Sequence, residues 1–215
     1  MDNNNYIPAL RFNWLTKLYN PLVAFTMPEA KFKKALIEQA DIEPNHRVLD
    51  FGVGTATLSL MIKETKPSSE VNGVDVDEKI LSIAAKKIKK AKAKIFITKY
   101  DGVKLPYTDS SFDRVLTSLV FHHLTAGQKH NSLVEIKRVL KPNGELHIAD
   151  WGKASSVLMR SLFFFVQLLD GFKTTTDNVK GLMPAYIENA GFKKVEIKRN
   201  YSTIFGTLTL YKAIN

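Results

Sequence analysis

Short apolar runs alternate with stretches of helical periodicity along most of the chain. Five runs have the length and apolar character of buried strands, at residues 46–50, 71–75, 94–98, 113–118 and 145–150. Apolar spacing predicts helices at residues 28–40, 55–64, 78–90, 126–140 and 178–190, and two further strands at 193–198 and 202–211. Strands that alternate with helices pair in parallel through right-handed crossovers. We therefore expect an α/β fold with a mostly parallel seven-stranded sheet, an antiparallel last strand and helices on both faces.

The length of 215 residues fits a single domain. Within it we expect an N-terminal helical cap at 1–44, a core at 45–150, an insertion at 151–177, and a C-terminal helix and strand pair at 178–215. The insertion interrupts the alternation and contains the most apolar run, LFFFVQLL at 162–169. A membrane-spanning helix needs about 20 residues, so this run is too short to be one. The run is expected to serve as a lid, a dimer contact or a contact with a membrane surface.

The composition excludes several kinds of chemistry. The chain has no cysteine, which rules out disulfides, thiolate metal sites and cysteine nucleophiles. The absence of cysteine fits a reducing cytoplasm, where we expect the protein to be located. No group of His, Asp and Glu has the spacing of metal ligands, so we predict a site that needs no metal. The N-terminus lacks a basic segment followed by an apolar run, so no signal peptide is expected.

The net charge of +10 is concentrated in one stretch of the sequence. Residues 86–104 contain eight lysines and a single acid, Asp101. An excess of this kind is typical of a solvated helix face, of attraction to anionic lipid, or of nucleic-acid binding. Aromatic residues that could stack on bases do not interleave with the lysines of the helix and its end, at 86–92, which favours the solvated face.

A glycine turn follows the first strand of the core, in the sequence VLDFGVGTA at 48–56. Gly52 and Gly54 stand where the strand turns tightly into a helix, and glycine lets the backbone approach a ligand closely. Asp75 ends the next strand, where a carboxylate can accept hydrogen bonds from both hydroxyls of a ribose. The loop lacks the third glycine of a dinucleotide fingerprint and the lysine of a P-loop. These features predict an adenosine-type ligand and disfavour NAD binding and ATP hydrolysis.

Five sequence blocks occur in an order that is typical of one family. They are VLDFGVGTA at 48–56, GVDVDEKIL at 73–81, YDGVKLPYTDSSFDRV at 100–115, SLVFHHL at 118–124 and EIKRVLKPNGELHIAD at 135–150. With these blocks the chain resembles the class I S-adenosylmethionine-dependent methyltransferases, close to the small-molecule group that includes the ubiquinone/menaquinone C-methyltransferases. The resemblance implies a Rossmann-like class I methyltransferase fold, S-adenosylmethionine as the cofactor and methyl transfer as the activity. Ala56 departs from the pattern, since many members have a third glycine there.

The resemblance also implies roles for residues of the glycine loop and of the chain before the core. Gly52, Val53 and Gly54 would hold the methionine part of the cofactor, and Asp50 would orient their loop. Tyr19 looks like an N-terminal tyrosine that covers the cofactor in this family.

Further roles follow for residues near the ends of the second, third and fourth strands. Asp75 would bind the ribose hydroxyls, with Val76 beside the adenine. Asp101 would accept a hydrogen bond from the adenine amino group, with the amide of Gly102 nearby. Ser118 and Leu119 would face the amino group and the sulfonium methyl of the cofactor.

Methyl transfer from a sulfonium is an in-line displacement, in which the protein mainly positions the two reactants. A base is needed only where the acceptor must lose a proton. His122 and His123 follow the fourth strand and are candidates for that base; otherwise they simply begin the next helix. We predict methyl transfer to a small, apolar or aromatic acceptor. Methylation of RNA or protein, and cofactor binding without catalysis, stay open as alternatives.

Overall fold

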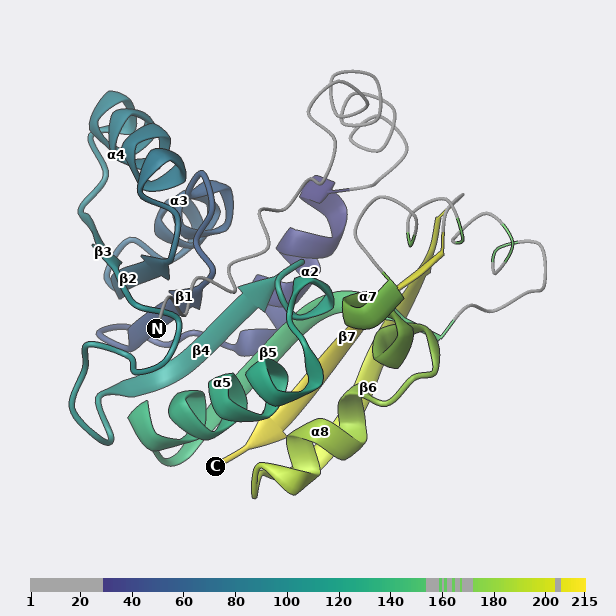
Figure 1. The fold of residues 1–215 in the computed structure, drawn as a ribbon. Coiled ribbons are helices and arrows are strands. Elements are labelled where there is room, and N and C mark those ends of the chain that lie inside the picture. The colour runs from purple at the N-terminus through teal and green to yellow at the C-terminus, as the bar shows by residue number, and fades with distance from the viewer. Residues whose placement is uncertain are drawn as a thin grey trace, which may run out of the picture.

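Seven strands form one sheet at the centre of the described chain (Figure 1). The computed structural model describes residues 29–153, 159, 161, 164, 167, 172–203 and 206–215. The strands are β1 (Arg47–Phe51), β2 (Glu70–Asp75), β3 (Ile95–Lys99), β4 (Phe112–Ser118), β5 (Leu140–Gly152), β6 (Lys193–Ser202) and β7 (Thr207–Ile214). The helices are α2 (Glu29–Ala40), α3 (Thr57–Thr65), α4 (Glu78–Ala91), η1 (Phe121–His123), α5 (Ala126–Val139), α7 (Phe172–Val179) and α8 (Met183–Asn189).

The strand order is β3-β2-β1-β4-β5-β7-β6. All neighbours from β3 to β5 pair in parallel, whereas β7 runs antiparallel to both β5 and β6. The chain therefore reverses direction only in its last strand, which inserts between two strands that precede it. The predicted α/β fold, with its mostly parallel sheet and antiparallel last strand, is confirmed.

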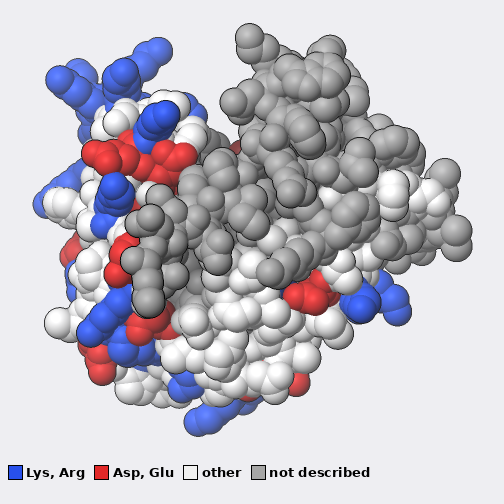
Figure 2. Space-filling view, viewed as in Figure 1, with Lys and Arg blue, Asp and Glu red and all other residues white. Residues whose placement is uncertain are grey.

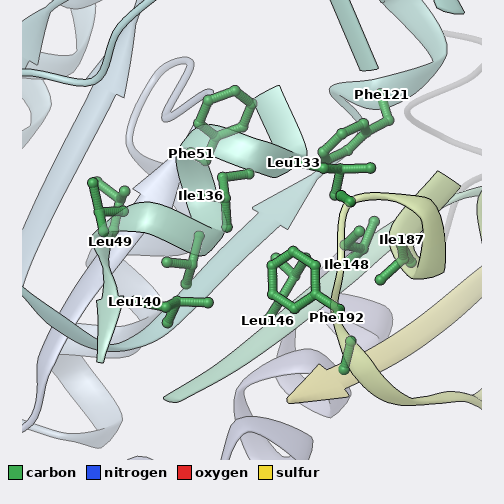
Figure 3. Close-up of a cluster of buried hydrophobic side chains, with 14 of the residues drawn as sticks. Leu49, Phe51, Phe121, Leu133, Ile136, Leu140, Leu146, Ile148, Ile187 and Phe192 are labelled. Carbon is green, nitrogen blue, oxygen red and sulfur yellow. The ribbon is translucent and has the colours of Figure 1, made fainter. Parts of the chain in front are cut away.

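Apolar side chains cover both faces of the sheet. α5 and α8 lie on one face, and Figure 3 shows Leu133 of α5 and Ile187 of α8 among the side chains that pack on Leu146 and Ile148 of β5. On the other face, α2 and α3 pack on strands β1, β2 and β4 through Phe32, Leu36, Leu58, Ile62, Val48, Val71 and Leu116. Each such side chain stabilises the fold by about 1.5–3 kcal/mol when fully buried. These two layers fix the sheet whose edge carries the site.

The parallel register brings the carboxyl ends of neighbouring strands to a common edge. Phe51, the last residue of β1, pairs with Val74 of β2 and Thr117 of β4. Ser118, the last residue of β4, pairs with Ala149 of β5. The loops that leave these four strands are therefore neighbours, and a ligand bound there would touch several of them.

The region after β5 differs from the prediction in two ways. Trp151 and Gly152, assigned to an insertion, continue β5. The helix expected over 178–190 is two helices, α7 and α8, because Gly181 adopts a left-handed φ of 74° and a proline stands in the first turn of α8. Most of the predicted insertion, including the apolar run 162–169 as a whole, and residues 1–28 of the predicted cap lie outside the described residues. Among the described helices, none has the length and apolarity to span a membrane.

A group of charged residues ties three strands together at Glu145. The Glu145 carboxylate on β5 accepts a hydrogen bond from Lys212 Nζ of β7 at 2.7 Å, and Nε2 of the buried His147 lies 3.1 Å from it. Arg114 Nε of β4 lies 3.7 Å from the same carboxylate. Burial acts to raise the pKa of Glu145, but these hydrogen bonds and charges outweigh burial and hold the pKa at about 2. The carboxylate is therefore ionised wherever the protein is folded at ordinary pH.

We expect Glu145→Gln to destabilise the protein by about 2–3 kcal/mol at pH 7, because the folded state stabilises the ionised carboxylate. A carboxyl with a lowered pKa loses its contribution as the pH falls from about 4.5 toward 2, so the difference from the unsubstituted protein should shrink over that range. Urea unfolding at a series of pH values measures this. A stability difference that stays constant down to pH 3 would contradict the assignment.

Candidate functional site

The two glycines between β1 and α3 serve different purposes. Gly52 has a φ of 73°, and a Cβ at this position would collide with the side chain of Val120 from the loop after β4. Gly54 has a φ of 53°, but among the described residues the nearest atom to a Cβ there, the Gly52 carbonyl oxygen, is 4.0 Å away. Gly52 therefore allows two loops to pack together, whereas Gly54 leaves open space where a ligand can approach the backbone.

Asp75, at the end of β2, holds the glycine loop in place. Its Oδ2 accepts the Gly54 N–H at 2.9 Å, and its Oδ1 accepts the Asp77 N–H at 3.0 Å. Each carboxylate oxygen can accept more than one hydrogen bond. Asp75 therefore fixes the loop and keeps acceptor capacity for the two hydroxyls of a ribose.

A second acidic group lies in the loop after β3. Asp101 Oδ1 accepts the N–H groups of Lys104 and Val103 at 2.9 and 2.8 Å, and these two bonds lower the pKa of Asp101. Both bonds fall on Oδ1, so Oδ2 is available to a ligand donor such as an amino group. A Cβ added to Gly102 would come within 3.5 Å of the Val76 side chain, which means that the loops after β2 and β3 lie against each other.

Asp50 is buried beneath the glycine loop. Its Oδ2 accepts a hydrogen bond of 2.7 Å from the Ser59 hydroxyl of α3, and the side chain is 1% exposed. Burial raises the pKa of Asp50 to about 6, despite the hydrogen bond from Ser59 and the charge of Lys33, which both act to lower it. Asp50 therefore connects β1 to α3 at a cost to the stability of its charged form.

The loop after β4 is organised by the carboxylate of Asp150, at the end of β5. Asp150 Oδ2 accepts the N–H groups of Phe121 at 2.7 Å, Val120 at 3.1 Å and His122 at 3.4 Å. Its Oδ1 lies 2.8 Å from Nδ1 of His122 and accepts the Trp151 N–H at 2.7 Å. Sequence reasoning placed Asp150 at a strand end but missed this role.

The two histidines of this loop differ in chemistry. Burial acts to raise the pKa of Asp150, but His122, the Trp151 N–H and His123 together outweigh burial and lower it. An ionised carboxylate can only accept hydrogen bonds, so Nδ1 of His122 carries the proton. Burial lowers the pKa of His123 to about 3, and the charge that His122 can carry adds to this effect. The two rings lie close together, with 3.9 Å between their centroids. His123 therefore stays neutral at physiological pH.

Two residues at the end of β4 carry local strain or an unmet hydrogen bond. Ser118 Oγ is buried and has no hydrogen-bond partner in the part of the chain that the structure describes. Leu119 has a left-handed φ of 60° and donates its N–H to the Ala149 carbonyl at 2.8 Å. Strain and unsatisfied polar groups cost free energy and are frequent at ligand sites.

The chemistry of this edge fits S-adenosylmethionine better than a dinucleotide. Asp75 and Asp101 present carboxylates, which suit hydroxyls, an amino group and a cation but repel a diphosphate. Ser118 adds a buried hydroxyl without a partner among the described residues, and Gly54 leaves open space. Within the described ranges, no three His, Asp or Glu side chains come together as a metal ion would require.

The structure gathers nearly all the residues singled out in the sequence at this edge. Ten of them lie on or directly after β1 to β4: Asp50, Gly52, Val53, Gly54, Asp75, Val76, Asp101, Gly102, Ser118 and Leu119. His122 and His123 follow in η1, and Tyr19 lies outside the described residues. Ser59 and Asp150 were missed. Asp150 could have been found, because it ends a predicted strand as Asp75 does.

The raised pKa of Asp50 predicts how stability depends on pH without the cofactor. The folded protein binds this proton more tightly than the unfolded chain, so the group lowers stability as the pH rises from 3.8 through about 6. We expect Asp50→Asn to be more stable than the unsubstituted protein at pH 8, by up to about 3 kcal/mol, and the gain to vanish near pH 4. Thermal unfolding against pH measures this. Asp41→Asn, in an exposed turn, is the control, and an equal gain at both pH values would contradict the assignment.

Comparison with known proteins shows which proteins this chain is similar to. A family model described as a methyltransferase domain matches residues 48–144. The chain is 31% identical over 134 residues to the demethylmenaquinone methyltransferase of Thermus thermophilus, covering 62% of this chain and 60% of the relative. It is 30% identical over 128 residues to the ubiquinone/menaquinone biosynthesis C-methyltransferase UbiE of Bordetella avium, covering 59% and 49%. The matched part of the chain thus spans about half to three fifths of the length of these relatives.

A solved structure shows the same fold. The S-adenosylmethionine-dependent methyltransferase from Aquifex aeolicus superimposes with a TM-score of 0.64 at 20% sequence identity, covering 95% of this chain and 100% of that chain. The shared fold, the matching family model and the acidic, glycine-lined edge of the sheet agree with one another. The chain thus has the fold of the class I S-adenosylmethionine-dependent methyltransferases, matches a methyltransferase domain over residues 48–144, and is similar to the UbiE group.

Proposed function

We propose that the protein transfers a methyl group from S-adenosylmethionine to a small, apolar or aromatic acceptor by in-line displacement. One observation carries this proposal: the glycine loop with its acidic neighbours and the histidine loop held by Asp150 lie at the ends of adjacent parallel strands. A cofactor in the first loop and an acceptor beside the second would be close enough to react.

The relatives favour an aromatic ring as the acceptor. One is named as a demethylmenaquinone methyltransferase, and the other as a ubiquinone/menaquinone biosynthesis C-methyltransferase. A hydroquinone carbon becomes nucleophilic when a ring hydroxyl loses its proton. Leu119, which directly precedes the histidine loop, is only partly buried and supplies apolar surface there. We therefore infer that a reduced quinone or a related phenol is the acceptor class.

Bound S-adenosylmethionine supplies an activated methyl group, so the protein has to bind, orient and, for a phenol, remove a proton. His122 is the better of the two candidate bases. Its Nδ1–H is held by the Asp150 carboxylate at 2.8 Å, and that carboxylate would stabilise the imidazolium formed when Nε2 accepts a proton. His123, with a pKa of about 3, binds a proton too weakly for this role.

The basic surface lies away from the proposed reaction site. α4 begins at the carboxyl edge after β2 and returns to the opposite edge, where β3 begins. Lys86, Lys90 and Lys94 belong to the second half of this path, and Figure 2 shows the blue side chains that gather over α4. The face of α4 that contains Leu81 and Ala84 is buried on the sheet, so the exposed lysines form its solvated face. Their position supports a small acceptor over an anionic polymer.

We expect Asp75→Ala to weaken S-adenosylmethionine binding by at least about 1.5–3 kcal/mol, the range for hydrogen bonds to a charged group. Isothermal titration calorimetry measures the affinity. Asp77→Ala is the matched control, because it removes the N-cap of α4 but no proposed ribose contact. Unchanged affinity in Asp75→Ala would overturn the assignment of Asp75.

Turnover tests the proposed acceptor class and base. With labelled S-adenosylmethionine, we expect label in reduced naphthoquinones or simple phenols and none in RNA. His122→Gln should lower kcat by about 100-fold or more with unchanged cofactor affinity, and His123→Gln by much less. The loss in His122→Gln should shrink toward pH 10, where the phenol ionises unaided. Label in RNA alone, or cofactor binding without turnover on any acceptor, would overturn the proposal.

A further inference from the structure

Asn178 of α7 reaches the Asp150–His122 pair. This residue is fully buried, and its Nδ2 donates to the Trp151 carbonyl at 3.0 Å and to Asp150 Oδ1 at 3.4 Å. The amide orientation follows from these partners, because the reverse orientation would set Oδ1 against two acceptors. Asn178 thus contacts the same carboxylate oxygen that lies 2.8 Å from Nδ1 of His122.

The position of α7 is fixed by a buried lysine of α5. Lys129, 0% exposed, donates from Nζ to the Thr174 carbonyl at 2.6 Å and lies 3.4 Å from Oδ2 of Asp177. The Tyr186 hydroxyl of α8 donates to the same Asp177 oxygen at 3.0 Å. These contacts are satisfied only when α7 occupies one position along α5, so they set the place of Asn178, the next residue after Asp177.

Neither the buried Lys129–Asp177 pair nor the buried Asn178 amide is what stability alone would favour. Burial acts to lower the pKa of Lys129, and a buried ion pair can often be replaced by apolar residues without loss of stability. Oδ1 of Asn178 is buried and meets no hydrogen-bond donor among the described residues, which also costs free energy. Buried polar groups of this kind can favour one packing of neighbouring helices over others. Here the groups that they hold in place include Asp150, the partner of His122.

We propose that Asn178 is a positioning residue for His122, and that the Lys129–Asp177 pair positions Asn178. The Asn178 amide fixes the rotation of the Asp150 carboxylate, so that Oδ1 receives Nδ1–H of His122 in a single geometry. The inference rests on the proposed function, in which His122 is the base. Its structural part concerns only the hydrogen bond between His122 and Asp150.

The test combines turnover with a signal from His122 that does not depend on turnover. Asn178→Leu removes the donor at nearly equal volume, and Asp177→Asn keeps the shape of the ion pair but removes its charge. Lys137→Met is the control for Lys129→Met, since Lys137 lies on the same helix and also loses one hydrogen bond, to Asn215. Nitrogen–proton NMR of the imidazoles detects the Nδ1–H signal of His122. This signal is assigned by its absence from the spectrum of His122→Gln.

We expect Asn178→Leu, Asp177→Asn and Lys129→Met to exchange the Nδ1 proton of His122 at least tenfold faster, and to lower kcat about tenfold with unchanged cofactor affinity. Asn178→Leu removes an unsatisfied oxygen but also the hydrogen bonds to the Trp151 carbonyl and to Asp150, so we expect it to fold with somewhat lower stability. Lys137→Met should change neither signal nor kcat. If Lys129→Met fails to fold, the other two variants decide.

An unchanged His122 proton signal in Asn178→Leu and Asp177→Asn would overturn the inference. A changed signal with full kcat would overturn the functional part of the inference. Full kcat in His122→Gln would instead overturn the base assignment of the proposed function, and the NMR result would still decide whether Asn178 positions His122.

Discussion

The parallel register of β1, β2, β4 and β5 is the constraint on which the rest of the structure depends. Parallel strands all end at one edge, so side chains that follow them are brought together although they are far apart in sequence. Asp75 and Asp150 are 75 positions apart, yet each organises a loop at that edge by accepting backbone N–H groups. Both carboxylates therefore build the site before any ligand is bound.

The acidic residues at the strand ends differ in pKa, and both burial and hydrogen-bond donors contribute to the difference. Asp101 is exposed and its loop amides favour the ionised form, whereas Asp50 is buried and favours the neutral form. Asp150 is as deeply buried as Asp50, but the backbone donors and His122 keep it ionised. The number of donors, and not burial alone, decides in which direction the pKa of each carboxyl moves from its ordinary value.

The order of strands and helices could be predicted because it depends on local periodicity, and the glycine loop with Asp75 because the pattern itself is local. The break between α7 and α8 was missed, since Gly181 within a helical pattern is not by itself a stop signal. The difference between His122 and His123 could not be predicted from adjacent identical residues. That difference depends on Asp150, which lies 28 residues away in sequence. Asn178 was unrecognisable for the same reason, because its partners come from another strand.

The two loop glycines have different surroundings, and this difference affects which substitutions each position can accept during evolution. The requirement at Gly52 is internal, since Val120 fills the space that a side chain would need. At Gly54 only a left-handed torsion has to be accepted, which asparagine also tolerates, and the space beyond is open. A descendant that no longer bound a cofactor would still need glycine at position 52 but could vary at position 54. The residue at position 54 would then separate binding from non-binding members of the lineage.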